Sequence, residues 1–200
     1  MSAENNVVWQ ETAIKEEERA HLKKQTSFCI WLTGLSGAGK TTLANMLEQE
    51  LFARGMHTFI LDGDNIRHGL NTDLGFTDKD RTENIRRVAE VSKLFVEAGV
   101  ISIVSFISPF QKDRLLAKNI ISSEKFLEIF VDTSIGVCEQ RDVKGLYRKA
   151  RLGIIRNFTG IDSEYQRPED PDLRVDSENT TSGDCVEKII DFLVSKRLIK

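Results

Sequence analysis

Apolar residues along the chain fall into two kinds of pattern: short continuous runs and stripes at helical spacing. The clearest runs, at 28–33 and 100–107, are rich in β-branched and aromatic residues, which is typical of strands buried on both faces. Between them, residues 82–98 place apolar side chains on one helical face and stop at Gly99, as helices commonly do. The pattern predicts strands that alternate with helices.

The same patterns continue through the rest of the chain. Further strands are expected at 57–61, 126–131 and 173–175, and further helices at 41–53, 111–122, 134–152 and around 186–193. Such alternation predicts an α/β fold with a doubly wound, mainly parallel five-stranded sheet flanked by helices. Sheets of this kind bind ligands at the carboxyl ends of their strands, so that edge is where functional residues are expected.

Length and composition add the domain organisation. The 200 residues are 40% hydrophobic and 30% charged, as in a soluble globular protein of one domain. Residues 1–26 are polar, with an exposed helix around 16–19, and predict an N-terminal helical extension. Residues 27–200 are expected to form the single folded domain, and no internal repeat suggests another.

Charge and cysteines narrow the function classes. The net charge of −3 disfavours a general nucleic-acid binder, and without a signal peptide or a membrane-spanning run we expect no membrane association. The chain has three cysteines, Cys29, Cys138 and Cys185. Their odd number and the lack of a Cys-x-x-Cys pair favour a reducing, cytoplasmic location. Cys29 and Cys138 lie among apolar residues and are expected to be buried.

The strongest chemical signal is a phosphate-binding loop. Gly34-Leu-Ser-Gly-Ala-Gly-Lys-Thr41 matches G-x-x-x-x-G-K-[ST] and lies between a predicted strand and a predicted helix. Glycines let backbone N–H groups surround phosphate oxygens, and the helix N-terminus favours the anion. Lys40 is expected to reach the β- and γ-phosphates of ATP, and Thr41 to ligate Mg²⁺. The predicted ATP-binding residues are Gly34, Leu35, Ser36, Gly37, Ala38, Gly39, Lys40, Thr41 and Thr42.

Two carboxylates follow the second predicted strand. Asp62 and Asp64 are separated by one glycine and emerge beside the expected γ-phosphate. Phosphoryl transfer to a hydroxyl needs one carboxylate to accept the proton and others to organise Mg²⁺. We predict Asp64 as the base and as a metal contact, with Asp62 supporting it; an ordinary Asp-Gly turn is the alternative.

Several longer motifs carry a family resemblance. They are Gly34 to Thr42, Asp62-Gly-Asp-Asn-Ile-Arg67, Gly69-Leu-Asn-Thr-Asp-Leu-Gly-Phe76, Asp80 to Arg87, Ile107-Ser-Pro109, Phe130-Val-Asp-Thr133, Lys144-Gly-Leu-Tyr147 and Phe158-Thr-Gly-Ile-Asp162. Through these motifs, and through a Val8-Trp9 leader before an acidic helix, nearly the whole chain resembles the adenylylsulfate kinases of the P-loop kinase superfamily. The resemblance implies ATP-dependent phosphorylation of the 3′-hydroxyl of adenylylsulfate in sulfate assimilation, with Mg²⁺ and a homodimeric state.

The resemblance also implies an acceptor pocket. Arg67 and Arg81 would bind the phosphosulfate, and Phe76 and Phe158 would stack on the adenine. Asn84 lies one helical turn beyond Arg81 and would face the same pocket.

Ile107 and Ser108 close the list of implied acceptor contacts. The family resemblance implies a phosphoserine intermediate at Ser108. An acceptor hydroxyl already in line with the γ-phosphate would not need this covalent step, so we expect Ser108 to hydrogen-bond the substrate instead.

A basic segment at 141–160 predicts a helical lid over the phosphates. Arg141 and Lys144 are the residues expected to reach them, whereas Arg148, Lys149 and Arg151 are also compatible with a solvated helix face. Three other functions stay open at this point: a small-molecule kinase for a nucleoside monophosphate, gluconate or shikimate, a non-catalytic sensor, and a nucleic-acid end kinase. The pair Phe76 and Phe158 disfavours the other small-molecule kinases, and the retained Lys40 disfavours the sensor. The acidic net charge disfavours the nucleic-acid end kinase.

Overall fold

The computed structural model describes residue 8 and residues 10–200. Its centre is one five-stranded parallel sheet with the strand order β2-β3-β1-β4-β5. The strands are β1 (Cys29–Thr33), β2 (Thr58–Asp62), β3 (Ile101–Ser105), β4 (Phe126–Asp132) and β5 (Leu173–Asp176). Every pairing between neighbours is parallel. The predicted doubly wound sheet is confirmed, and it is parallel throughout.

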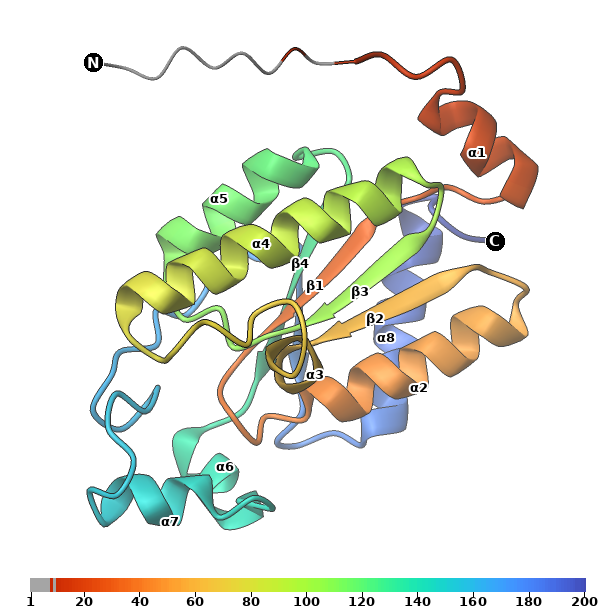
Figure 1. Ribbon diagram of the computed structural model, residues 1–200. Helices are drawn as coiled ribbons and strands as arrows, with labels where there is room; N and C mark the ends of the chain where they lie inside the picture. The colour runs from red at the N-terminus through yellow and green to blue at the C-terminus, as the bar shows by residue number, and fades with distance from the viewer. Residues whose placement is uncertain (1–7, 9) are drawn as a thin grey trace.

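Helices cover both faces of this sheet (Figure 1). They are α1 (Glu16–Lys23), α2 (Lys40–Ala53), α3 (Gly63–Arg67), α4 (Asp78–Glu97), α5 (Gln111–Ile121), α6 (Ile135–Arg141), α7 (Leu146–Arg151) and α8 (Ser182–Ser195). Successive side chains of a strand point to opposite faces. Ile30 and Leu32 of β1 therefore pack in the core beneath α2 and α8, and Trp31 packs in the core beneath α4 and α5.

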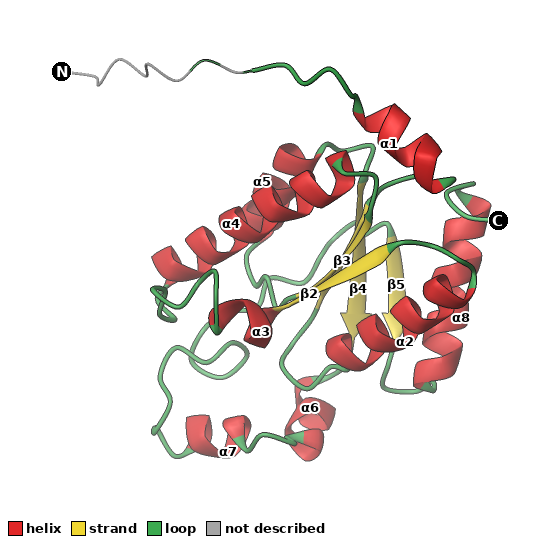
Figure 2. Cartoon of the chain, turned by 45° about the vertical axis from the view of Figure 1, so that its right-hand side comes forward, coloured by secondary structure: helices red, strands yellow, loops and turns green. Residues whose placement is uncertain are grey.

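Three short helices lie at the carboxyl ends of the strands. Figure 2 shows α3, α6 and α7 beyond the strand arrowheads, and α1 at the opposite end of the sheet. The loops that follow β1, β2, β3 and β4 therefore converge on one edge, as parallel strands require.

The predicted helix over 134–152 is wrong as a single helix, because it is interrupted between α6 and α7. Gly145 has φ +64°, a left-handed conformation that ends helical geometry. The carboxylate of Asp142 accepts hydrogen bonds from the backbone N–H of Tyr147 (3.1 Å) and of Arg148 (3.0 Å). Asp142 therefore satisfies donors at the start of a second helix, a role that its polar side chain favours over continuing the first.

Smaller differences concern element boundaries. The helix predicted from residue 82 begins at Asp78, because Thr77 accepts a hydrogen bond from the N–H of Asp80 and caps it. The strand predicted over 100–107 ends at Ser105, opposite the last residue of β2. No helix was predicted at α3, because its five residues are too few to show a helical period.

The N-terminal segment forms the exposed helix that was predicted, with no buried residue in α1. Its side chains nevertheless contact the folded domain: Glu16 pairs with Lys125 at 2.5 Å, and Arg19 donates to the carbonyl of Glu97 at 3.3 Å. The expected leader residue Trp9 lies outside the described residues. The division into 1–26 and 27–200 stays a prediction.

The cysteines behave as small apolar residues. Cys29 and Cys138 are buried, as predicted, and Cys185 is buried too. Within the described residues, none of the helices is both long and apolar enough to cross a membrane.

Candidate active site

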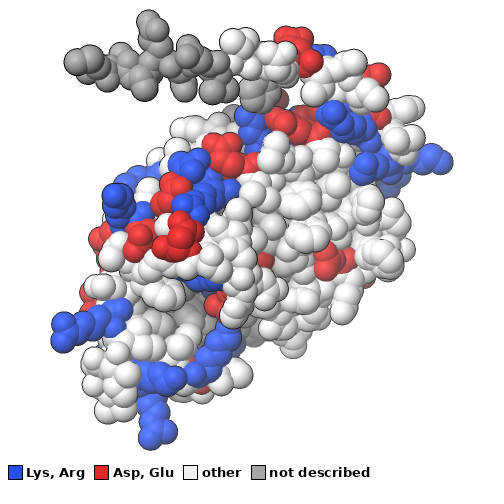
Figure 3. Space-filling view, viewed as in Figure 1, with Lys and Arg blue, Asp and Glu red and all other residues white. Residues whose placement is uncertain are grey.

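A cavity of about 1210 Å³ lies at the carboxyl edge of the sheet. It is lined by the phosphate-binding loop, α3, the start of α4, the loop after β3 and the segment around α7. Figure 3 shows Lys and Arg side chains, with few acidic ones, on the surface over α7 and its neighbouring loops. The residues predicted to bind the nucleotide and those predicted to bind the acceptor therefore line one cavity, part of whose wall is basic.

The phosphate-binding loop has the backbone shape that its glycines permit. A Cβ at Gly34 would lie 2.6 Å from the carbonyl oxygen of Val131, so no side chain fits there. Gly37 has φ +77° and would bring a Cβ within 3.0 Å of the carbonyl oxygen of Cys138. Of the nine predicted loop residues, the cavity is lined by Ser36, Gly37, Gly39, Lys40, Thr41 and Thr42, whereas Gly34, Leu35 and Ala38 do not line it.

Lys40 is held within this loop. Its Nζ donates to the carbonyl oxygens of Gly34 (2.9 Å) and Leu35 (2.7 Å). Burial lowers the pKa of Lys40 to about 8, although the charges of Asp62 and Asp64 act in the opposite direction. The ammonium group is therefore fixed and poorly solvated, so a phosphate anion would gain strongly from its charge.

The two carboxylates have different surroundings. Asp62 is 8% exposed and both of its oxygens are occupied: one accepts from Thr41 Oγ1 at 2.8 Å and the other from the N–H of Asp64 at 3.0 Å. The side chain of Asp64 is 65% exposed and forms an ion pair with Lys144. Asp62 is thus a structural acceptor beside Thr41, and Asp64 has a carboxylate free to meet a ligand.

Oxygen atoms that could ligate Mg²⁺ lie around Thr41. Its hydroxyl lies 2.8 Å from Asp62 Oδ2 and 3.4 Å from Ser105 Oγ. Across the part of the chain that the structure describes, no three His, Cys, Asp or Glu side chains form a metal cage. Mg²⁺ commonly binds through one or two protein oxygens together with substrate phosphates. The few oxygen atoms around Thr41 are consistent with a site of that kind.

Arg67 and Phe76 form one wall of the acceptor half. The guanidinium of Arg67 lies 4.4 Å from the ring centroid of Phe76 and donates to the carbonyl oxygens of Leu74 and Gly75. Phe76 is 60% exposed and lines the cavity, so its ring is not part of the core. An exposed aromatic ring at a cavity wall is suited to stacking on a flat ligand.

Arg81 and Asn84 extend from the first turns of α4 into the same cavity. Arg81 donates to Thr159 Oγ1 at 2.8 Å and to the carbonyl oxygen of Asn157, which ties α4 to the segment after α7. Burial, together with the positive charge of Arg67, lowers the pKa of Arg81. Two cations that repel each other across a cavity favour an anion between them.

The remaining predicted acceptor residues also line the cavity. Phe158 is half-buried and meets the ring of Tyr147 edge-on at 4.9 Å, so it serves both as a cavity wall and as packing. Ile107 and Ser108 follow β3. Asp62, which was also predicted to contact the acceptor, lines the cavity as well, so all eight predicted acceptor residues lie around one space although the motifs that contain them are far apart in the sequence.

The basic segment divides into residues that line the cavity and residues that do not. Arg141 and Lys144 line the cavity, where Arg141 donates to the carbonyl oxygen of Ser177 at 2.5 Å. Arg148, Lys149 and Arg151 are exposed and do not line it; Arg151 pairs instead with Glu139. Arg141 and Lys144 therefore lie at the cavity and the other three face solvent, and the role of the segment as a lid stays a prediction.

Some cavity residues were missed by sequence reasoning. Tyr147 donates to the carbonyl oxygen of Ser36 at 2.8 Å, and Ser177 donates to that of Ala38 at 2.6 Å. Ser105 ends β3 beside Thr41, and its position at a strand carboxyl end was a usable signal. Tyr147 and Ser177 reach the loop from distant segments; Tyr147 belongs to the Lys144-Gly-Leu-Tyr147 motif but was given no role, and no motif contains Ser177.

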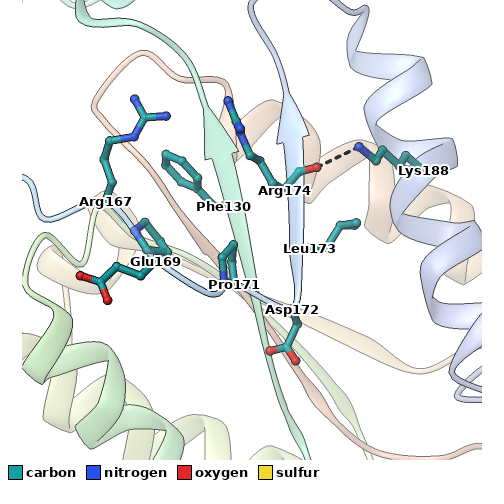
Figure 4. A pocket seen from close by; sticks show the side chains of 9 residues that line it. Phe130, Arg167, Glu169, Pro171, Asp172, Leu173, Arg174 and Lys188 are labelled. Carbon is teal, nitrogen blue, oxygen red and sulfur yellow. Dashed lines mark hydrogen bonds between the residues drawn. The ribbon is translucent and has the colours of Figure 1, made fainter.

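A second cavity, of about 550 Å³, lies along β4 and β5 (Figure 4). Its positive side chains already have partners: Arg167 and Arg174 both bind Asp132, at 2.7 and 2.5 Å, and Lys188 donates to the carbonyl oxygen of Arg174. It shares no lining residue with the larger cavity. The positive charges in this second cavity are therefore satisfied within the protein.

Comparison with known proteins agrees with these features. The family model described as adenylylsulphate kinase matches residues 26–176. Adenylyl-sulfate kinases of Oceanobacillus iheyensis and Clostridium acetobutylicum are 51% and 52% identical to this chain, over 100% and 97% of it and over 100% and 96% of their own lengths. The structure of a Mycobacterium tuberculosis APS kinase in complex with AMPPNP and APS has a TM-score of 0.82 and 45% identity, and covers 85% of this chain and 99% of that one. This chain belongs to the adenylylsulphate kinase family.

Proposed function

We propose that this protein transfers the γ-phosphoryl group of ATP to the 3′-hydroxyl of adenylylsulfate, giving ADP and 3′-phosphoadenylylsulfate for sulfate assimilation. The observation that carries the proposal is the single cavity in which a phosphate-binding loop faces Arg67, Arg81 and Phe76. The family membership supplies the identity of the acceptor, because its members and a liganded relative bear that name.

At the nucleotide end, backbone N–H groups of the glycine-rich loop would surround the phosphates. Lys40 would exchange its two carbonyl contacts for phosphate oxygens and neutralise their charge. Thr41 and Asp64, with Asp62 behind them, would hold Mg²⁺, which supplies charge neutralisation across the β- and γ-phosphates. Arg141 and Lys144 would approach from the lid and exclude water.

At the acceptor end, Arg67 and Arg81 would bind the phosphosulfate and Asn84 would add a polar contact. The rings of Phe76 and Phe158 would hold the adenine. Fixing the acceptor in this way presents its 3′-hydroxyl to the γ-phosphate, which accounts for much of the catalysis in phosphoryl transfer. Asp64 would accept the hydroxyl proton.

The decisive test is ADP release from MgATP with adenylylsulfate as acceptor, beside AMP, gluconate and buffer controls. We expect turnover with adenylylsulfate alone and a product phosphorylated at the 3′ position. Equal turnover with AMP or gluconate would replace the proposed acceptor, and ATP binding without turnover on any of them would favour a sensor.

ATP affinity is expected to depend on pH through Lys40. Its pKa of about 8 in the free protein means that the group is cationic below pH 8 and loses its proton as the pH rises. Bound phosphates favour the cation, so the Kd for MgATP should rise above pH 8, by up to about tenfold per unit. Calorimetric titration between pH 7 and pH 9.5 measures this slope.

The matched control is Lys40→Met, which should bind MgATP more weakly and without that rise. If the variant kept the wild-type slope, another group would be responsible for it.

Three finer features of the proposal rest on the family resemblance or on composition: Mg²⁺ as the metal, a homodimer as the assembly and the cytoplasm as the location. The cysteine usage supports a reducing compartment.

A further inference from the structure

Ser108 has an unusual backbone conformation in the loop between β3 and α5. It is 2% exposed, lines the larger cavity and has φ +41°. Left-handed φ values are uncommon outside glycine, and a following proline restricts the backbone further. Residues held in such conformations tend to lie at functional sites, where the surrounding structure has to maintain them.

Three different parts of the fold hold this loop by its carbonyl groups. Thr33 Oγ1 of β1 donates to the carbonyl oxygen of Ile107 at 2.7 Å. Arg114 Nη1 of α5 donates to that of Ser108 at 2.9 Å. The N–H of Gln166 donates to that of Pro109 at 2.8 Å. Three consecutive carbonyls are therefore fixed, and the backbone of Ser108 has little freedom to relax.

The side chain of Ser108 is held as well, by Trp31. The indole Nε1 of Trp31 lies 3.1 Å from Ser108 Oγ, in a buried contact, and Trp31 itself is 0% exposed. An indole N–H can only donate, so the serine oxygen is the acceptor in this hydrogen bond. Among the described residues no other side chain or carbonyl bonds to Ser108 Oγ, and its hydroxyl proton stays available in the cavity.

We propose that Trp31 is a positioning residue that fixes Ser108 as a hydrogen-bond donor to an oxygen atom of the acceptor substrate. This inference rests on the proposed function. The indole occupies the Ser108 oxygen, and no described group lies where it would take the hydroxyl proton, so the geometry favours donation over nucleophilic attack. The packing of the Trp31 ring against Phe126, with centroids 5.5 Å apart, fixes the direction of the indole N–H.

The first test is Trp31→Phe in the full chain. Removing the N–H should raise the KM for adenylylsulfate by about 5- to 10-fold, the usual effect of one hydrogen bond, and leave the KM for ATP within about twofold. Val96→Ala is the matched control, because it loosens the same core cluster and leaves the rings packed against Trp31 unchanged. The KM for adenylylsulfate should hardly change in that control. A Trp31→Phe enzyme with wild-type KM values, or a Val96→Ala enzyme with the same selective rise, would overturn the inference.

The second test does not depend on how well Trp31→Phe folds. The chain contains two tryptophans, so Trp9→Phe leaves Trp31 as the only indole N–H in a ¹H–¹⁵N spectrum. Saturating adenylylsulfate should shift that resonance when Ser108 is present and shift it far less in Ser108→Ala. An equal shift in both proteins, or none in either, would contradict the inference.

The two proposals fail in distinguishable ways. Wild-type protein that does not phosphorylate adenylylsulfate would remove the proposed function and the inference with it. Wild-type turnover combined with an unaffected Trp31→Phe enzyme and an unmoved indole resonance would remove the inference alone.

Discussion

Asp64→Asn is expected to lower kcat by about 10³-fold while the protein stays folded, because the amide cannot accept the proton of the acceptor hydroxyl. The carboxylate of Asp64 is 65% exposed and faces Lys144, whereas both oxygens of Asp62 are occupied by Thr41 and by the backbone. Only Asp64 has an oxygen free to take a proton. Single-turnover phosphoryl transfer at saturating MgATP and adenylylsulfate measures the effect.

Two comparisons sharpen this result. Asp62→Asn should act chiefly on the Mg²⁺ requirement, and high Mg²⁺ should recover part of its activity. Asp191→Asn alters an exposed carboxylate on α8 outside the cavity and should leave kcat unchanged. A fully active Asp64→Asn enzyme would disprove the assignment of the base, and a dead Asp62→Asn enzyme beside it would move that role to Asp62.

Arg114→Met is expected to cause a large loss of stability, about 3–5 kcal/mol, or roughly 6–20 °C in Tm. Arg114 is 2% exposed, and its Nε lies 2.6 Å from Glu128 Oε1 without hydrogen-bond geometry, so the contact is mainly between charges. Burial raises the pKa of Glu128, and Arg114 opposes that rise. Without the arginine, the largely buried carboxylate of Glu128 loses its nearest counter-charge. Thermal and urea unfolding measure the loss.

The pH dependence and a double variant identify the cause. A carboxyl whose native pKa lies above its unfolded value loses stability as the pH rises through that window, so the deficit of Arg114→Met should be greater at pH 8 than at pH 5. Arg114→Met/Glu128→Met should regain most of the stability, since an apolar pair of similar volume replaces both charges. Arg86→Met, at an exposed ion pair, should cost at most about 1 kcal/mol. A double variant no more stable than the single one would show that lost packing and the lost hydrogen bond to the carbonyl oxygen of Ser108, rather than the unpaired charge, cause the loss.

Much of the fold followed from the sequence because each strand or long helix carries its own hydrophobic period. The runs at 28–33 and 126–131 correspond to β1 and β4 within one residue at each end. The failures occurred where one polar residue decides the structure. Asp142 and Gly145 divide one apparent helix into α6 and α7, because a capping carboxylate and a left-handed glycine outweigh the helical pattern around them.

The candidate site followed from the sequence to a similar extent. The phosphate-binding loop is a local structure, and its spacing between a strand and a helix was enough to place Lys40 and Thr41 at one edge of the sheet. The acceptor residues were named through resemblance, and all of them line the same cavity. Their roles in binding stay predictions.

The sequence by itself determined the alternation of the five strands with the long helices, the phosphate-binding loop and the carboxylates that follow β2. These features depend on residues close together in the chain, so their periodicity and turn residues can be recognised within short stretches of sequence. Only the tertiary structure decided that Trp31 holds Ser108, that Arg81 ties α4 to Thr159 and that Arg114 lies against Glu128. Those contacts join residues 14 to 78 positions apart, and their geometry exists only once the sheet and its two helix layers have packed and fixed the direction of each side chain.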